Sequence, residues 1–94
     1  MKMEELTPRV SGDGAEKHIP EVDGRDNRVT VRLSHPSERD HRVDWVCLVT
    51  DLGTQRKLLG PGRGGRVDFF IEEGERPVAA FAYCNNHGLW VREL

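Results

Sequence analysis

Two short segments of the chain carry apolar side chains at alternate positions. Residues 28–33 and residues 66–72 each place an apolar side chain at every second position. These apolar positions are Val29, Val31, Leu33, Val67, Phe69 and Ile71. Since successive side chains of a β-strand point to opposite faces, the pattern predicts two strands with one face buried.

Three more segments indicate strands by other patterns. Residues 77–84 are apolar on both faces, which is typical of a central strand. In residues 43–49 one expected face carries Val43, Trp45, Cys47 and Val49, and the other carries Val46 and Leu48 with Asp44. Residues 89–94 are expected to form a last, short strand.

Glycine and proline interrupt the chain at short intervals, and no stretch keeps a helical periodicity. Several short strands joined by turns predict an all-β fold, an antiparallel β-sandwich. Residues 1–15 are polar and are expected to form an irregular N-terminal arm. The glycine-rich run at 60–65 lacks the Gly-Lys-Ser/Thr ending of a phosphate-binding loop, so we interpret it as a hairpin connection without chemistry of its own.

Length and charge exclude several classes of protein. A chain of 94 residues suits one small domain. The formal net charge of −2 argues against a nucleic-acid partner, because proteins that bind nucleic acids usually carry a strong excess of basic residues. No apolar run approaches the roughly 18 residues of a membrane span. The N-terminal residues carry no apolar segment of the kind found in signal peptides, so we expect a cytoplasmic protein whose two cysteines are thiols or metal ligands.

All four histidines lie in three short segments. EKHIP carries His18, HPSERDH carries His35 and His41, and CNNHGLW pairs Cys84 with His87. Imidazole and thiolate ligands suit zinc, copper or iron and do not suit calcium or magnesium. A single histidine of this kind is more often a surface or capping residue, but four confined to such segments indicate a metal site.

The number of candidate ligands distinguishes the metals. A structural zinc site closes at four ligands, one fewer than this set provides. Blue copper on a β-sandwich usually takes a methionine after its last histidine, whereas the only methionines here are Met1 and Met3. Five ligands leave one open position on a six-coordinate ion, which iron fits best. Cys47 lies within an expected strand with no nearby ligand and is interpreted as a plain buried thiol.

Together and in this order, EKHIP, HPSERDH followed by VDWV, and CNNHGLW resemble the superoxide reductase family, which includes neelaredoxin and desulfoferrodoxin. The resemblance runs from Glu16 to Trp90. It is to the one-iron branch, because the N-terminal four-cysteine centre of desulfoferrodoxin is missing from this sequence. It implies that residues 16–94 form an immunoglobulin-like β-sandwich that binds one mononuclear non-haem iron.

The resemblance also implies roles for individual residues. The iron ligands would be four equatorial histidines and an axial thiolate: His18, His35, His41, His87 and Cys84. Lys17 matches the family's cationic residue beside the open position, and Glu16 matches the carboxylate that can occupy that position in the ferric state.

The activity so implied is the one-electron reduction of superoxide to hydrogen peroxide. The family further implies rubredoxin as electron donor and a homo-oligomer, a dimer or tetramer. Two alternatives remain open at this point. One is a cupredoxin-like electron-transfer protein, and the other is a domain whose metal site has no catalytic role.

Overall fold

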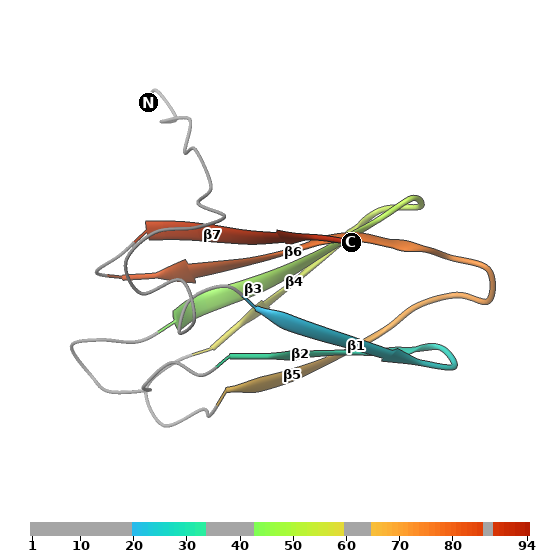
Figure 1. The fold of residues 1–94 in the computed structure, drawn as a ribbon, viewed down its shortest axis with the longest axis horizontal. Helices are drawn as coiled ribbons and strands as arrows, with labels where there is room; N and C mark the ends of the chain where they lie inside the picture. Colours follow the sequence, from blue (N-terminus) through green and yellow to red (C-terminus); the bar gives the residue numbers. More distant parts are fainter. Residues whose placement is uncertain (1–19, 34–42, 60–64, 86–87) are drawn as a thin grey trace.

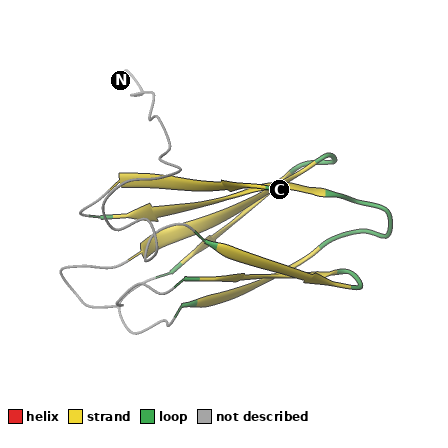
Figure 2. Ribbon diagram, in the orientation of Figure 1, coloured by secondary structure: helices red, strands yellow, loops and turns green. Residues whose placement is uncertain are grey.

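The computed structural model describes residues 20–33, 43–59, 65–85 and 88–94. Within these ranges the protein has seven strands and no helix (Figures 1 and 2). The strands are β1 (Glu21–Arg25), β2 (Arg28–Arg32), β3 (Val43–Thr50), β4 (Thr54–Leu58), β5 (Arg66–Phe70), β6 (Pro77–Cys84) and β7 (Gly88–Glu93). All strand pairs are antiparallel, in a sheet of order β1-β2-β5 and a sheet of order β4-β3-β6-β7. The predicted β-sandwich is confirmed.

The hydrophobic core lies between the two sheets. The three-stranded sheet contributes mainly Val29, Val31, Val67 and Phe69, and the four-stranded sheet contributes mainly Val43, Val46, Leu48, Ala80 and Ala82. These side chains occupy alternate positions along their strands. The two-residue period of the sequence therefore distinguishes the residues that face the core from those that face away from it. Strand β6 lies between β3 and β7, which confirms its prediction as a central strand.

The pattern did not predict two of the strands, β1 and β4. Both are edge strands, and all of their residues are exposed or half-buried. In β1 only Val22 packs against the core, and β4 contributes no residue to the core cluster. An edge strand that buries so little needs no alternation of apolar residues, and therefore leaves no signal in the sequence.

The expected faces of β3 are wrong at one position. The pattern predicts Val43 on the face of Trp45, but Val43 belongs to the core cluster together with Val46 and Leu48. The register of β3 against β6 shifts between Val43 and Trp45, as in a β-bulge. An extra residue in one strand reverses the side chains beyond it, so Val43 turns inward.

The glycine-rich run at 60–65 is not a hairpin connection, because β4 pairs with β3 and β5 pairs with β2. The run therefore links strands of different sheets. At its end, Gly65 accepts a hydrogen bond from the Leu33 backbone N–H at 2.7 Å. A Cβ atom on Gly65 would come within 2.0 Å of the Leu33 carbonyl oxygen, so the close approach requires glycine.

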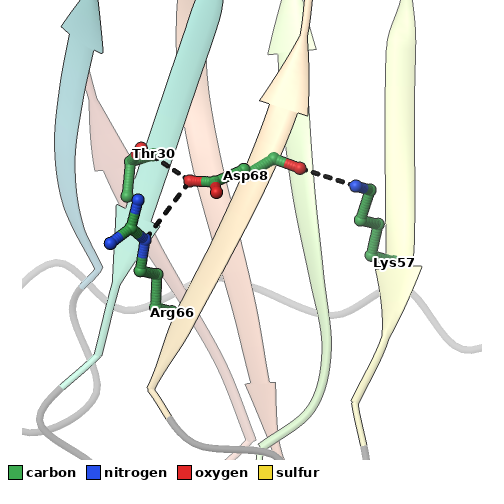
Figure 3. Close-up of polar contacts among 4 residues, drawn as sticks. All are labelled: Thr30, Lys57, Arg66 and Asp68. Atoms are coloured by element: carbon green, nitrogen blue, oxygen red, sulfur yellow. Dashed lines mark hydrogen bonds and ion pairs between the residues drawn. The ribbon is translucent and has the colours of Figure 1, made fainter.

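Side chains form hydrogen bonds between the two sheets along both pairs of facing edges. Lys57 Nζ on β4 donates to the Asp68 carbonyl oxygen on β5 at 2.6 Å (Figure 3), and Gln55 Nε2 donates to the Phe70 carbonyl oxygen at 2.8 Å. On the other side, Arg92 Nε donates to the Pro20 carbonyl oxygen. These bonds satisfy main-chain acceptors at strand edges and hold the two sheets together.

Candidate metal centre

The strand ends that flank the predicted ligands gather at one end of the sandwich, on the left in Figure 1. Four described residues mark these ends: Pro20 follows His18 by two residues, Leu33 precedes His35 by two, Val43 follows His41 by two, and Gly88 directly follows His87. The β-turn connections at the opposite end carry none of the predicted ligands. The topology thus brings the described residues that flank the three histidine segments to the same end of the fold.

Cys84 is the predicted ligand that the structure describes. It is the last residue of β6, it is 1% exposed, and it faces the interior like Ala80 and Ala82 on the same strand. Its neighbours across the sheet are Val43 on one side and Gly88 on the other. Pairing on both sides fixes the position of its thiol at the end of the core.

The backbone conformation at position 88 favours glycine. Gly88 has a φ of +81°, a conformation that residues with a side chain rarely adopt. It pairs with Cys84 and closes the β6–β7 hairpin. In the sequence Gly88 indicates only a turn, and its position directly after a candidate ligand is the signal that could have marked a tight turn there.

The remaining predicted site residues lie outside the described residues. These are Glu16, Lys17, His18, His35, His41 and His87. Within the four described ranges no group of three or more histidine, cysteine, aspartate or glutamate side chains could hold a metal. The full ligand set therefore stays a prediction.

Cys47 differs from Cys84 in its environment. It is half-buried, not fully buried as expected, and it lies on the face of β3 that points away from the core. Partial burial raises the pKa of its thiol, and the nearby Arg56 guanidinium lowers it by a smaller amount. A thiol held in its neutral form on the outer face of the sheet is not placed to share a metal with Cys84.

A polar cluster lies on the outer face of the three-stranded sheet (Figure 3). Thr30 Oγ1 donates to Asp68 Oδ1 at 2.7 Å, and Arg66 Nε lies 3.4 Å from the same oxygen. The hydrogen bond from Thr30 is the main cause that holds the pKa of Asp68 below its usual range, with a further contribution from Arg66. Arg66 and its cross-strand neighbour Arg32 lie at the same end of the fold as Leu33, where Asp68 pairs with Arg66 and Glu21 lies opposite Arg32 in the register.

The described residues contain no helix that is long and apolar enough to cross a membrane.

Comparison with known proteins identifies the family. The desulfoferrodoxin family model matches residues 11–93. A desulfoferrodoxin homolog of Archaeoglobus fulgidus is 36% identical over 93 residues, covering 96% of this chain and 71% of the relative. The desulfoferrodoxin of Nitratidesulfovibrio vulgaris is 39% identical over 92 residues, covering 94% of this chain and 71% of the relative.

Solved structures agree. The superoxide reductase of Treponema pallidum superposes with a TM-score of 0.80 at 36% identity, covering 85% of this chain and 68% of that one. The one-iron superoxide reductase of Giardia intestinalis superposes with a TM-score of 0.66 at 32% identity, covering 84% of this chain and 99% of that one. The fold, the strand ends around Cys84 and these relatives lead to one conclusion: the chain belongs to the desulfoferrodoxin family.

Proposed function

We propose that this protein is a superoxide reductase, which reduces superoxide to hydrogen peroxide at one iron bound by His18, His35, His41, His87 and Cys84. The observation that carries the proposal is the position of Cys84, a buried thiol at the end of β6, at the end of the fold where the described strand ends that flank the histidine segments also lie. Relatives named superoxide reductase, from organisms as distant as Treponema pallidum and Giardia intestinalis, support the activity.

The residues present fit an iron centre. Cys84 is in no disulfide and lies buried at the end of the core, and a cysteine sulfur is a ligand that iron accepts. Four imidazoles complete a set of soft and intermediate donors that iron accepts. A bound iron would supply the electron that superoxide takes up, and the thiolate would make it a stronger donor.

The chain's own residues would then bind the anion and supply protons. Superoxide needs one electron and two protons to become hydrogen peroxide. Lys17 would attract the anion and orient a water that donates a proton, and Glu16 would cover the open position after the electron has left.

We further propose a cytoplasmic location, a homo-oligomer and rubredoxin as the electron donor. The location is supported by the two thiols, because Cys47 and Cys84 project from opposite faces of their sheet and cannot form a disulfide with one another within the chain. The choice of rubredoxin as electron donor rests on the family resemblance. The rate of electron transfer from reduced rubredoxin to the oxidised protein tests it.

Metal analysis, visible spectroscopy and pulse radiolysis of the purified protein test the activity. We expect one iron per chain, a thiolate charge-transfer band in the ferric protein, and second-order decay of superoxide that yields hydrogen peroxide without oxygen. Cys84→Ser should lose the band, whereas the matched control Cys47→Ser should keep it. Stoichiometric zinc or copper in the native protein, or release of oxygen, would refute the proposal.

A further inference from the structure

The main-chain groups of β4 point alternately toward β3 and toward the free edge of the sheet. The Leu59 N–H donates to the Asp44 carbonyl oxygen on β3 at 2.8 Å, which fixes the alternation of the antiparallel ladder. Every second residue before Leu59 therefore faces β3 with its main chain. The intervening residues, Thr54, Arg56 and Leu58, direct their N–H and carbonyl groups outward. None of the described residues forms a hydrogen bond with these outward groups.

The neighbouring edge of β5 differs, because side chains of β4 satisfy its main chain. The Lys57 side chain donates to the Asp68 carbonyl oxygen at 2.6 Å (Figure 3), and the Gln55 side chain donates to the Phe70 carbonyl oxygen at 2.8 Å. On this side of the sandwich, the edge whose main chain can accept a new strand is therefore that of β4. Extended peptides add to a sheet at edges of this kind.

Two hollows between β4 and β5 lie beside this edge. The first has a volume of about 360 Å³, and its charged residues are Lys57, Arg66 and Asp68. The second has a volume of about 460 Å³, and its charged residues are Glu72 and Glu75. The first hollow thus carries a net positive charge and the second a net negative charge, so the two would accept side chains of opposite sign.

An antiparallel strand added to β4 would continue the alternation of the sheet. Lys57 and Gln55 lie opposite core residues of β3, so the residues of the new strand opposite them also point inward, toward the two hollows. An acidic residue fits opposite Lys57, and a basic residue fits opposite Gln55. Between them, on the outer face, a second acidic residue fits opposite Arg56. Leu58 is 71% exposed and favours an apolar β-branched neighbour.

A second copy of this chain is a poor occupant of the edge. Antiparallel pairing of two β4 strands about a two-fold axis at Arg56 would place Arg56 of one copy opposite Arg56 of the other. If the axis shifted to Lys57, two lysines would lie opposite one another instead. Like charges directly opposite one another destabilise a strand pair. The charges of β4 therefore disfavour pairing with itself and favour pairing with an acidic strand.

We propose that the free edge of β4 binds an extended acidic segment of another protein by β-strand addition. The segment pairs antiparallel with Thr54–Leu58 and places acidic side chains opposite Arg56 and Lys57. Main-chain hydrogen bonds supply the affinity, and the two charged hollows supply the specificity. This inference goes beyond superoxide reduction and does not depend on the iron.

A synthetic nonapeptide with the central sequence Val-Glu-Glu-Lys-Val is the probe. When it lies antiparallel to β4, its first glutamate is opposite Lys57 and its second is opposite Arg56. Fluorescence anisotropy of the labelled peptide, titrated with the full chain, measures the dissociation constant. We expect saturable binding of one peptide per chain. The charge-reversed peptide Val-Lys-Lys-Glu-Val should bind at least about tenfold more weakly.

N-methylated peptides distinguish main-chain pairing from simple charge attraction. In the proposed register the N–H of the second glutamate points at β4, whereas the N–H of the first points away from it. Methylation of the second glutamate nitrogen should raise the dissociation constant by about tenfold or more, because it removes a donor and leaves an acceptor of β4 without a partner. Methylation of the first is the matched control and should leave the dissociation constant unchanged.

Variants of the protein test the register. Arg56→Glu should raise the dissociation constant of the probe by at least about tenfold, and a peptide with lysine in place of the second glutamate should recover much of that loss. Arg25→Glu reverses a charge on the three-stranded sheet and should have no effect. Amide hydrogen exchange gives an independent readout. The Arg56 N–H should become protected only when the peptide binds, whereas the Lys57 N–H, which faces β3, should be protected throughout.

Four results would overturn the proposal. The first is no saturable binding of the probe, and the second is equal affinity for the charge-reversed peptide. The third is an equal effect of the two methylations. The fourth is an Arg56 N–H that is already protected in the free protein, because another segment of this chain or a second copy then occupies the edge. None of these results bears on superoxide reduction, whose test measures the metal and the product.

Discussion

Cys47 and Cys84 lie on neighbouring strands of one sheet and project from opposite faces. Cys47 is opposite Phe81 in the register, three residues from Cys84 along β6. Cys84 is buried in the core, whereas Cys47 is half-buried on the outer face. The same sheet therefore gives one thiol to the predicted metal centre and keeps the other apart from it on the outer face.

The two thiols should differ in their reactivity toward iodoacetamide. Burial raises the pKa of Cys47, so its alkylation rate should rise with pH and reach its plateau later than that of an exposed cysteine. Arg56→Gln removes a cation that lowers this pKa, so it should shift the profile to still higher pH. Cys84 should react only after unfolding, because it is 1% exposed. Peptide mapping by mass spectrometry measures both rates, and a faster reaction at Cys84 in the native protein would contradict its burial.

Gly65→Ala should lower the free energy of unfolding by about 1–3 kcal/mol, the usual cost of forcing an atom into a packed site. The added Cβ would lie 2.0 Å from the Leu33 carbonyl oxygen, so the crossover between the sheets must shift. Gly53→Ala is the matched control, since a Cβ there meets nothing within 4 Å. Chemical denaturation measures the free energy of unfolding of both variants. Equal values would show that the connection between the sheets accommodates the added Cβ without loss of stability.

Thr30→Val should raise the pKa of Asp68 toward its ordinary value, because Thr30 provides the main hydrogen bond to the carboxylate. The pKa of Asp68 is lower in the folded protein than in the unfolded chain. Its contribution to stability is therefore complete above the unfolded value near 3.8, and is lost as the pH falls through the folded value. A carboxyl-detected NMR titration measures the pKa. Val22→Ala, which leaves this hydrogen bond intact, should not change it.

Lys17→Ala should slow the reaction with superoxide by roughly severalfold at low salt and flatten its dependence on ionic strength. The physical reason is the loss of one positive charge next to His18. Arg25→Ala removes a charge at the opposite end of the sandwich and serves as control. Pulse radiolysis at several salt concentrations gives the rates. If Lys17→Ala reacts like the parent protein at all of them, Lys17 does not steer the anion.

Much of the fold could be predicted from local patterns. The strands with an apolar face toward the core, β2, β3, β5 and β6, appear in the sequence because burial of one face selects alternate positions. Edge strands β1 and β4 bury little, so no pattern marked them. The bulge that turns Val43 inward and the crossing of residues 60–65 between sheets depend on pairing partners far away in the chain, which a local pattern does not contain.

The candidate site shows the same division. The sequence by itself determined the chemistry available: four histidines, a Cys-x-x-His pair, and Glu16 and Lys17 beside His18. Those residue types and their order identified the family, because each residue type specifies the donor atom that it can offer to a metal.

Only the tertiary structure decided which thiol faces the core and that the strand ends around the histidine segments meet at one end of the sandwich. It also decided that β4 pairs with one strand only among the described strands. These are consequences of antiparallel pairing and of the two-residue period of a strand, since a shift of one residue in register moves a side chain from one face to the other.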